Sequence, residues 1–246
     1  MWTRLDQLPW PAVADLLADG QDMLVLPCGA TEQHGGHLPI NTDTVIAENI
    51  CAYACEKANV QLLPALSYTV SVGHTDKWPG TFSLSHETFI KTIWELADWA
   101  KRTGWKKLLL VNSHFGNDAS LRVAIDKIRT DFLGEFQIGH RNTFQLSDEI
   151  WNYFISDAED LHANKAETDL MLHLAPDMVD MSKAEDDPDR TVGKCFSYPV
   201  AQTSLQGLTG NPTEGTAEAG EQLFNQMGDA LAEILTAAKV EQPPLP

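Results

Sequence analysis

Basic residues are scarce in this chain of 246 residues, which has 17 Lys and Arg against 35 Asp and Glu and a formal net charge of −18 at pH 7. A surface of that sign repels nucleic acid and anionic membranes, so we expect neither as a partner. The charge does not name a substrate, because bound divalent cations would reverse the local field in a site.

Long apolar runs are also absent. No segment approaches the roughly 18 apolar residues of a transmembrane helix, and the first residues show no secretory signal pattern. We therefore expect a cytoplasmic protein. No repeat or low-complexity linker divides the chain, and its length suits one α/β domain with a large core, which we predict to cover residues 1–246.

Cysteine is sparse, with four residues at Cys28, Cys51, Cys55 and Cys195. None forms a CxxC pair, and Cys51 and Cys55 lie at helical spacing within an apolar stripe. This pattern favours core thiols in a reducing compartment over disulfides or a thiolate metal site.

Apolar runs and amphipathic segments alternate at short spacing along the chain. Strands are predicted at 22–27, 60–64, 107–112 and 134–139. Helices are predicted before Gly20, at 43–58, 86–102 and 119–129, over most of 146–175, and at 216–239. Loops are predicted at 71–85 and at 176–213, the latter with room for edge strands. This alternation predicts an α/β fold with a mostly parallel central sheet covered by helices on both faces.

The stretch ATEQHGGHLPINTD, residues 30–43, follows the first predicted strand directly. It supplies four candidate metal ligands or proton carriers, which are Glu32, His34, His37 and Asp43. In open α/β sheets, ligands bind at the carboxyl ends of the strands, where this stretch begins. The sequence therefore predicts a binding site at this edge of the sheet.

Within an extended segment, Glu32 and His34 share a face and Gln33 points away. Asp43 returns after a short loop, at the start of the next helix. A carboxylate, an imidazole and a second carboxylate form a ligand set suited to Zn, Mn or Fe. An alternative reading exists for Asp43, because Asn41-Thr-Asp-Thr is also a helix N-cap sequence.

The strand predicted at 107–112 also ends in polar residues, among them His114. A histidine in such a loop can simply bond its own backbone. However, a doubly wound sheet brings adjacent strand ends into one crevice, so His114 is placed to meet the ligands of the first stretch. Together the two strand ends predict a metal site.

His162 and Glu167 lie in a helical pattern, HANKAETDLMLHL. A spacing of five puts them about 140° apart on an ideal helix. Both can reach one site only if His162 precedes the helix; otherwise they belong to a surface face. Lys165, taken alone, is a solvated charge, and Trp78 is either a pocket wall or ordinary packing.

Five segments, in order, resemble the creatininase (creatinine amidohydrolase) family. They are LPCGATEQHGGHLP at 26–39 with Thr42-Asp43, WPGTFSL at 78–84, VNSHFGN at 111–117, HAxxxETxLML at 162–172 and GxxGNP at 207–212. The first match is the most specific. Together the segments span roughly residues 24 to 222.

The resemblance implies a three-layer α/β/α sandwich, a cytoplasmic homo-oligomer that is often a hexamer, and a hydrolytic centre with two divalent ions (Zn, Mn or Fe). Carried onto the matching positions, Glu32 and His114 would hold one ion and His34 the second. Asp43 would bridge both.

The carboxylate of the second ion departs from creatininase itself, which has a glutamate where this chain has Gly116. Many relatives resemble this chain in using the glutamate of the HAxxxET segment, so Glu167 is assigned to the second ion. His162 matches the catalytic histidine of the family and would carry a proton to the leaving group. Three side chains are candidate substrate contacts: Trp78, His74 and Lys165.

The implied reaction is metal-assisted hydrolysis of a small molecule, either opening a cyclic amide or releasing an amide or formamide. Rival readings are a formamidopyrimidine deformylase, a hydrolase cleaving a C–C bond in an inositol-derived cyclic ketone (inosose ring opening), and a metal-binding protein without turnover. The chain departs from the family at Gly36, at Asn164-Lys165 and at 73–78, in segments expected to touch the substrate. The chemistry is therefore better supported than creatinine as the substrate.

Overall fold

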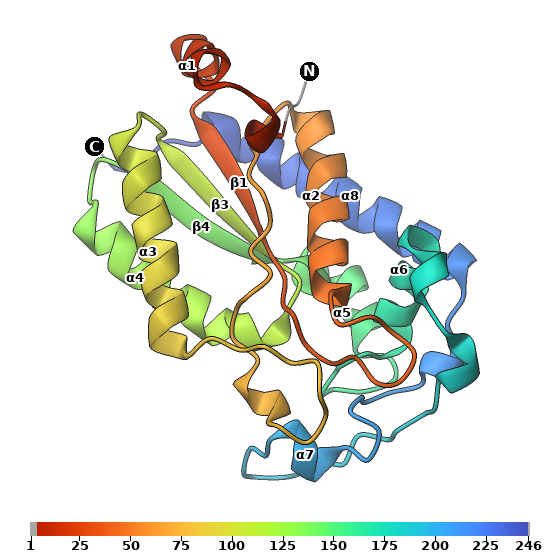
Figure 1. Cartoon of the computed structure of the whole chain (residues 1–246). Helices are drawn as coiled ribbons and strands as arrows, with labels where there is room; N and C mark the ends of the chain where they lie inside the picture. Colours follow the sequence, from red (N-terminus) through yellow and green to blue (C-terminus); the bar gives the residue numbers. More distant parts are fainter. Residues whose placement is uncertain (1–3, 246) are drawn as a thin grey trace.

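A parallel four-stranded sheet lies at the centre of the protein (Figure 1), whose computed structural model describes residues 4–245. The strand order is β2-β1-β3-β4, and every neighbouring pair is parallel. The strands are β1 Met23–Cys28, β2 Gln61–Leu62, β3 Lys107–Asn112 and β4 Gln137–Asn142. The predicted parallel sheet is confirmed.

The helices connect and cover these strands. The α-helices are α1 Trp10–Ala18, α2 Thr42–Ala58, α3 His86–Arg102, α4 Asp118–Asp131, α5 Asp148–Phe154, α6 Lys165–Leu174, α7 Val200–Thr203 and α8 Ala217–Val240. Short 3-10 turns lie at η1 Leu5–Gln7, η2 Val72–His74, η3 Phe115–Asn117, η4 Thr143–Gln145, η5 Pro176–Met178, η6 Met181–Lys183 and η7 Pro212–Glu214. No helix within 4–245 combines the length and apolarity needed to cross a bilayer.

Alternate side chains of β1 feed two separate cores, because successive residues of a strand point to opposite faces. Leu24 and Leu26 pack in one core with apolar residues of α3 and α4. Met23 and Val25 pack in the other with α2, α5, α6 and α8. Figure 1 shows α3 and α4 on one side of the sheet and α2 and α8 on the other. The predicted three-layer α/β/α arrangement is confirmed.

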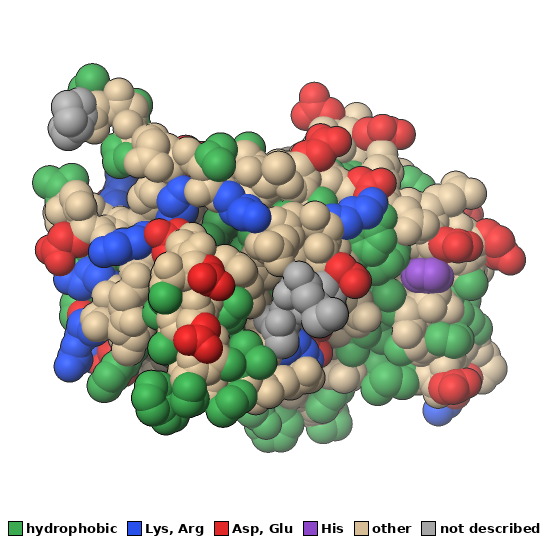
Figure 2. All heavy atoms as spheres, turned by 90° about the horizontal axis from the view of Figure 1, so that it is seen from above, with side chains coloured by type: hydrophobic (Ala, Val, Ile, Leu, Met, Phe, Trp, Pro, Cys, Tyr) green, Lys and Arg blue, Asp and Glu red, His purple; other side chains and the backbone are tan. Residues whose placement is uncertain are grey.

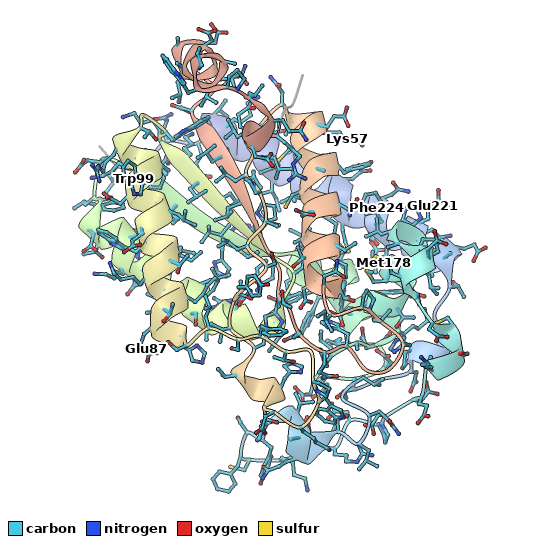
Figure 3. All side chains as sticks on the ribbon, in the orientation of Figure 1. Lys57, Glu87, Trp99, Met178, Glu221 and Phe224 are labelled. Atoms are coloured by element: carbon cyan, nitrogen blue, oxygen red, sulfur yellow. The ribbon has the colours of Figure 1, made fainter. Side chains whose placement is uncertain are left out.

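The helices beside the sheet run back against the strands, so their N-termini lie at the carboxyl ends of the strands. Figure 3 shows Glu87, in the first turn of α3, at the lower end of that helix and Lys57, in the last turn of α2, at the upper end of its helix. Side chains in the loops after β1 and β3 therefore lie near residues in the first turns of the helices, at the carboxyl edge of the sheet.

Three predictions about elements need correction. The strand β4 begins at Gln137 rather than at 134, because Gly134 has a φ of +76° and turns the chain after α4. The region 146–175 is interrupted between α5 and α6. The edge strands considered at 176–213 are absent from the described chain, where isolated bridges such as Asp187 to Gly210 connect the loops instead.

Cys28, Cys51 and Cys55 are buried free thiols, as predicted. Cys195 is exposed, so the core-thiol prediction is wrong for this residue, which lies in a loop on the surface. On the face seen in Figure 2, acidic side chains lie at several separate places with Lys and Arg among them. On that face the excess of acidic residues is spread out rather than gathered in one patch.

Close packing of α6 on α8 leads to a stability prediction for Gly220→Ala. A Cβ at position 220 would lie 1.9 Å from the backbone oxygen of Asp169, so α8 must move away from α6. We expect a loss of about 1–3 kcal/mol in the free energy of unfolding despite the higher helix propensity of alanine, measured by urea titration. Gly73→Ala is the control, because a Cβ there meets no atom within 4 Å. Equal stability of the two variants would contradict the packing argument.

Candidate active site

Four buried side chains converge at the carboxyl edge of the sheet. Glu32 and His34 follow β1, Asp43 lies in the first turn of α2, and His114 follows β3. His114 Nδ1 is 3.1 Å from Glu32 Oε1 and 3.3 Å from Asp43 Oδ2. His34 Nε2 is 3.4 Å from Asp43 Oδ1. The two oxygens of Asp43 therefore face two histidines that come from different strand ends.

Asp43 does not cap its helix. The N-cap position of α2 is Asn41, and no side chain forms a cap hydrogen bond there. The carboxylate of Asp43 is buried and directed at the histidines instead. The N-cap interpretation of this residue is therefore wrong.

His162 precedes α6, while Glu167 lies in its first turn. Between them, Ala163 adopts a left-handed φ of +48° and its N–H donates to Glu167 Oε2. Because of this bend, His162 and Glu167 can approach the same site, which their spacing would prevent on a continuous helix. Ligand atoms of His34, His162 and Glu167 lie within 4.8 Å of one another, as do those of Glu32, Asp43 and His114.

His74, on η2, which we predicted as a substrate contact, lies deep beside the buried carboxylates. Its Nε2 is 3.3 Å from Glu32 Oε2, and only 7% of the residue is exposed. Ligand atoms of Glu32, His74 and His162 form a third close group. His74 is thus part of the buried cluster.

Gln33 contradicts the prediction that it points away from the cluster. Its Nε2 donates to Gly207 O at 2.7 Å and lies 3.0 Å from His74 Nδ1 and 3.2 Å from His162 Nε2. The reason is that residues 29–33 form a loop rather than a strand, so side chains do not alternate between two faces.

Backbone carbonyls orient three of the histidines. His114 Nε2 donates to Val70 O at 2.8 Å, His34 Nδ1 to Glu32 O at 3.1 Å, and His162 Nε2 to Gln33 O at 2.9 Å. Each ring then presents its other nitrogen to the carboxylates. Metal-ligating histidines are held in this way, with the second N–H bonded to a carbonyl or carboxylate.

Several buried polar atoms of the cluster lack hydrogen-bond partners within 4–245. They are both carboxylate oxygens of Glu32, His34 Nε2 and Asp43 Oδ2. Leaving such groups unpaired is costly in a protein interior. Oxygen and imidazole nitrogen atoms held this way fit a divalent metal ion, which would satisfy them.

The cluster shifts the pKa of its own members. Burial would raise the pKa of Asp43, but His34 and His114 lower it below its usual range. Burial would lower the pKa of His34, but the Asp43 carboxylate raises it to about 10. Burial raises the pKa of Glu167 to about 7. Burial and the nearby His74 depress the pKa of His162 well below normal, which keeps this imidazole neutral.

Position 116 has no room for the glutamate that creatininase has at the matching position. A Cβ at Gly116 would lie 2.5 Å from His114 Nε2 and 2.7 Å from Val70 O, the two atoms that share a hydrogen bond. A side chain there would displace the imidazole. Glu167 is the carboxylate that reaches the second group of ligands.

A cavity of about 210 Å³ opens onto the cluster. Sequence reasoning missed most of its outer wall. This part of the wall comprises Val72 and Phe115, the pair Asp160 and Leu161, and Tyr198, Pro199 and Val200, the last at the start of α7. Isolated residues of loops and short turns carry no periodic signal. Partial burial and the nearby Asp189 raise the pKa of Asp160.

Two predicted substrate contacts lie elsewhere. Trp78 is half-buried beneath the ammonium group of Lys77, 4.2 Å from the ring centroid, and is not part of the cavity wall. Lys165 Nζ donates to Asp169 Oδ2 at 2.7 Å and to Tyr153 Oη at 2.8 Å, also outside the wall. Lys165 is therefore paired rather than solvated, and neither residue is carried forward as a substrate contact.

Other histidines have separate partners. His37 Nε2 bonds Thr168 Oγ1 at 2.9 Å, and burial lowers its pKa to about 4. His37 belongs to none of the three ligand groups. His140 bonds Asp118. His86 bonds Ser120 through Nδ1 and also lines the cavity.

Known proteins are similar to this chain in sequence over two thirds or more of its length. Creatinine amidohydrolase of Pseudomonas putida is 27% identical over 97% of this chain and 96% of its own length. The mycofactocin precursor peptide peptidase of Mycolicibacterium smegmatis is 29% identical, covering 86% and 83%. The 3-dehydro-scyllo-inosose hydrolase of Thermotoga maritima is 26% identical, covering 67% and 54%.

Among solved structures, a mutant creatininase superposes with a TM-score of 0.87 at 26% identity, covering 96% of this chain and 99% of that one. A manganese form of creatininase shares the fold with a TM-score of 0.84 at 23% identity, covering 98% of this chain and 100% of its own. A Zn–Zn form shares it with a TM-score of 0.82 at 24% identity, covering 96% of this chain and 98% of its own. The family model described as creatinine amidohydrolase matches residues 6–235. This chain therefore belongs to the creatininase family.

Proposed function

We propose that this protein is a metal-dependent hydrolase with a dinuclear centre that cleaves a C–N bond of an amide. The observation that carries the proposal is the position of Asp43. Its two oxygens face His34 and His114 from different strand ends, beside a buried Glu32 carboxylate whose oxygens have no hydrogen-bond partner among the described residues. A carboxylate shared in this way suits two neighbouring cations.

The ligands divide between two ions as the family resemblance implies. Glu32 and His114 would hold one ion, His34 and Glu167 the other, and Asp43 would bridge them. Two of the close groups of ligand atoms support this division, namely Glu32 with Asp43 and His114, and His34 with Glu167 and His162. Zn, Mn and Fe all accept carboxylate and imidazole ligands, and the manganese and Zn–Zn creatininase structures favour the first two. Bound there, the ions would supply Lewis-acid polarisation and lower the pKa of water.

His162 is the proposed proton carrier. Its Nε2–H is held by Gln33 O, so the free nitrogen is Nδ1, 3.6 Å from Glu32 Oε1. The depressed pKa keeps Nδ1 unprotonated near neutral pH, and a neutral imidazole can accept a proton and pass it to a leaving amine. His74 and the Gln33 side chain flank this ring and keep it in place.

Relatives that match most of the chain are named for amide cleavage, as an amidohydrolase or as a peptidase. The reaction class that these names share is C–N hydrolysis, and a cyclic amide is our leading substrate class. The peptidase adds an open-chain amide to the candidates. The shorter match to the inosose hydrolase favours C–C cleavage as the second candidate function. A formamide deformylase and a metal-binding protein without turnover are further outcomes of the tests below.

The domain count, location, assembly and partners of the protein stay predictions. We propose a single domain, a cytoplasmic location and a homo-oligomer such as a hexamer acting on a small molecule, with neither nucleic acid nor membrane as a partner. Light scattering on the purified protein measures the subunit number directly.

Replacing Asp43 with asparagine should remove most of both metal equivalents, because the bridging carboxylate serves both ions. Elemental analysis of the wild-type protein should show about two equivalents of Zn, Mn or Fe per subunit. Glu48→Gln, later in α2, is the control and should keep them. Full metal content in the Asp43 variant would refute the bridging role.

Replacing His162 with alanine should lower turnover at least about 100-fold while the metal content stays unchanged. The assay uses creatinine, hydantoins, formamides, dipeptides and inososes with added Mn²⁺ or Zn²⁺. His173→Ala, whose ring packs on Phe224 outside the cluster, is the control. Loss of metal from the His162 variant would make this residue a ligand instead, and absence of wild-type turnover across the panel would favour the non-enzymatic reading.

Zinc binding to the metal-free protein should release about one to two protons per subunit at pH 7. The pKa of His34 is about 10 and that of His114 is also raised, so both imidazoles carry protons that metal ligation displaces. The affinity for zinc should accordingly rise between pH 6 and pH 8. Titration calorimetry in buffers of different ionisation enthalpy measures the release, with His140→Gln as the control. Binding without proton release would mean that these imidazoles are not the ligands.

A further inference from the structure

The cavity above the cluster is acidic at its mouth as well as at its base. Its wall contains the carboxylates of Glu32, Asp43, Glu167 and Asp160, and none of the described residues that line it is Lys or Arg. Two divalent ions bound at the base would more than balance the charge of the three inner carboxylates. Asp160 is then the one carboxylate of the described wall that lies outside the proposed ligand set.

Asp160 has no cationic partner within 4–245. No salt bridge or side-chain hydrogen bond engages its carboxylate, although its backbone N–H donates to Asp189 Oδ2 at 3.1 Å. That bond brings a second carboxylate close to the first. The side chain of Asp189 is itself occupied by Thr191 and by the N–H of Glu159, so Asp160 is the free acceptor.

Much of the rest of the mouth is apolar and partly aromatic, although His86, Ser71 and Thr209 also line the cavity. Val72 and Phe115 are about half exposed, at 51% and 52%, and Tyr198 is 46% exposed. These side chains line the same cavity as Asp160. Aromatic faces attract cations, and the apolar surface suits a hydrocarbon group. A carboxylate beside such surfaces favours an organic cation over a hydrated metal ion or a phosphate.

We infer that Asp160 is a specificity-determining residue that receives a protonated amine or guanidinium group carried on an apolar part of the substrate. The inference rests on the proposed function, because the cavity must be the substrate site. It also deepens that function, since a phosphorylated substrate would find no cation in the outer wall. Cationic amides, including amides with a free amine, become the preferred substrate class.

The test compares two ligands of nearly equal shape, benzylguanidinium and the neutral benzylurea, bound to the zinc-loaded protein. Calorimetry should show the cation binding about tenfold more tightly to the wild type, which corresponds to about 1.4 kcal/mol. Asp160→Asn should reduce this preference to about onefold to twofold, because it removes the charge with little change of shape. Glu159→Gln is the matched control, since it removes an equal charge one residue earlier, outside the cavity wall.

Each outcome decides between the inference and its rivals. Loss of the preference in the Asp160 variant alone supports a local contact. Equal loss in both variants would mean that only the general negative field acts, and no preference in the wild type would mean that the mouth does not select cations; either result overturns the inference. Metal content and amide turnover are measured on the same samples. If those persist without a cation preference, the inference fails while the proposed function stands.

Discussion

The burial of the Asp43 carboxylate between two imidazoles is the interaction on which the rest of the site depends. A carboxylate and two histidines this far from water would be costly without compensation, and their pKa values shift in opposite directions to pair their charges. The same atoms form a ligand set for cations. A bound metal ion would therefore satisfy the buried polar atoms of the site that have no hydrogen-bond partner among the described residues.

The scaffold makes this arrangement possible through the parallel sheet. β1 and β3 are adjacent, so the loops after Cys28 and Asn112 leave the sheet side by side. The start of α2 returns to the same edge and delivers Asp43. The bend at Ala163 then brings His162 and Glu167 in from the other side. Candidate ligands from four segments, far apart in sequence, therefore lie close together at one cavity.

The mouth of the cavity is formed by other parts of the chain than its base. The base consists of residues from strand ends and first turns of helices, whereas the mouth consists of loop residues such as Asp160 and Tyr198. Loops tolerate change without disturbing the sheet, and the relatives of this chain have names that record different substrates. In this chain the mouth combines one free carboxylate with apolar and aromatic surface.

The sequence by itself determined the parallel three-layer fold, because apolar runs and amphipathic segments alternate with periods that only such layers bury. It also selected Glu32, His34, Asp43 and His114, because polar groups at adjacent strand ends must meet. The tertiary structure alone decided the helix break that joins His162 to Glu167, the inward turn of Gln33 and the pairing of Lys165. It also decided which loop residues close the cavity. These features depend on contacts between residues distant in sequence, and local periodicity carries no information about them.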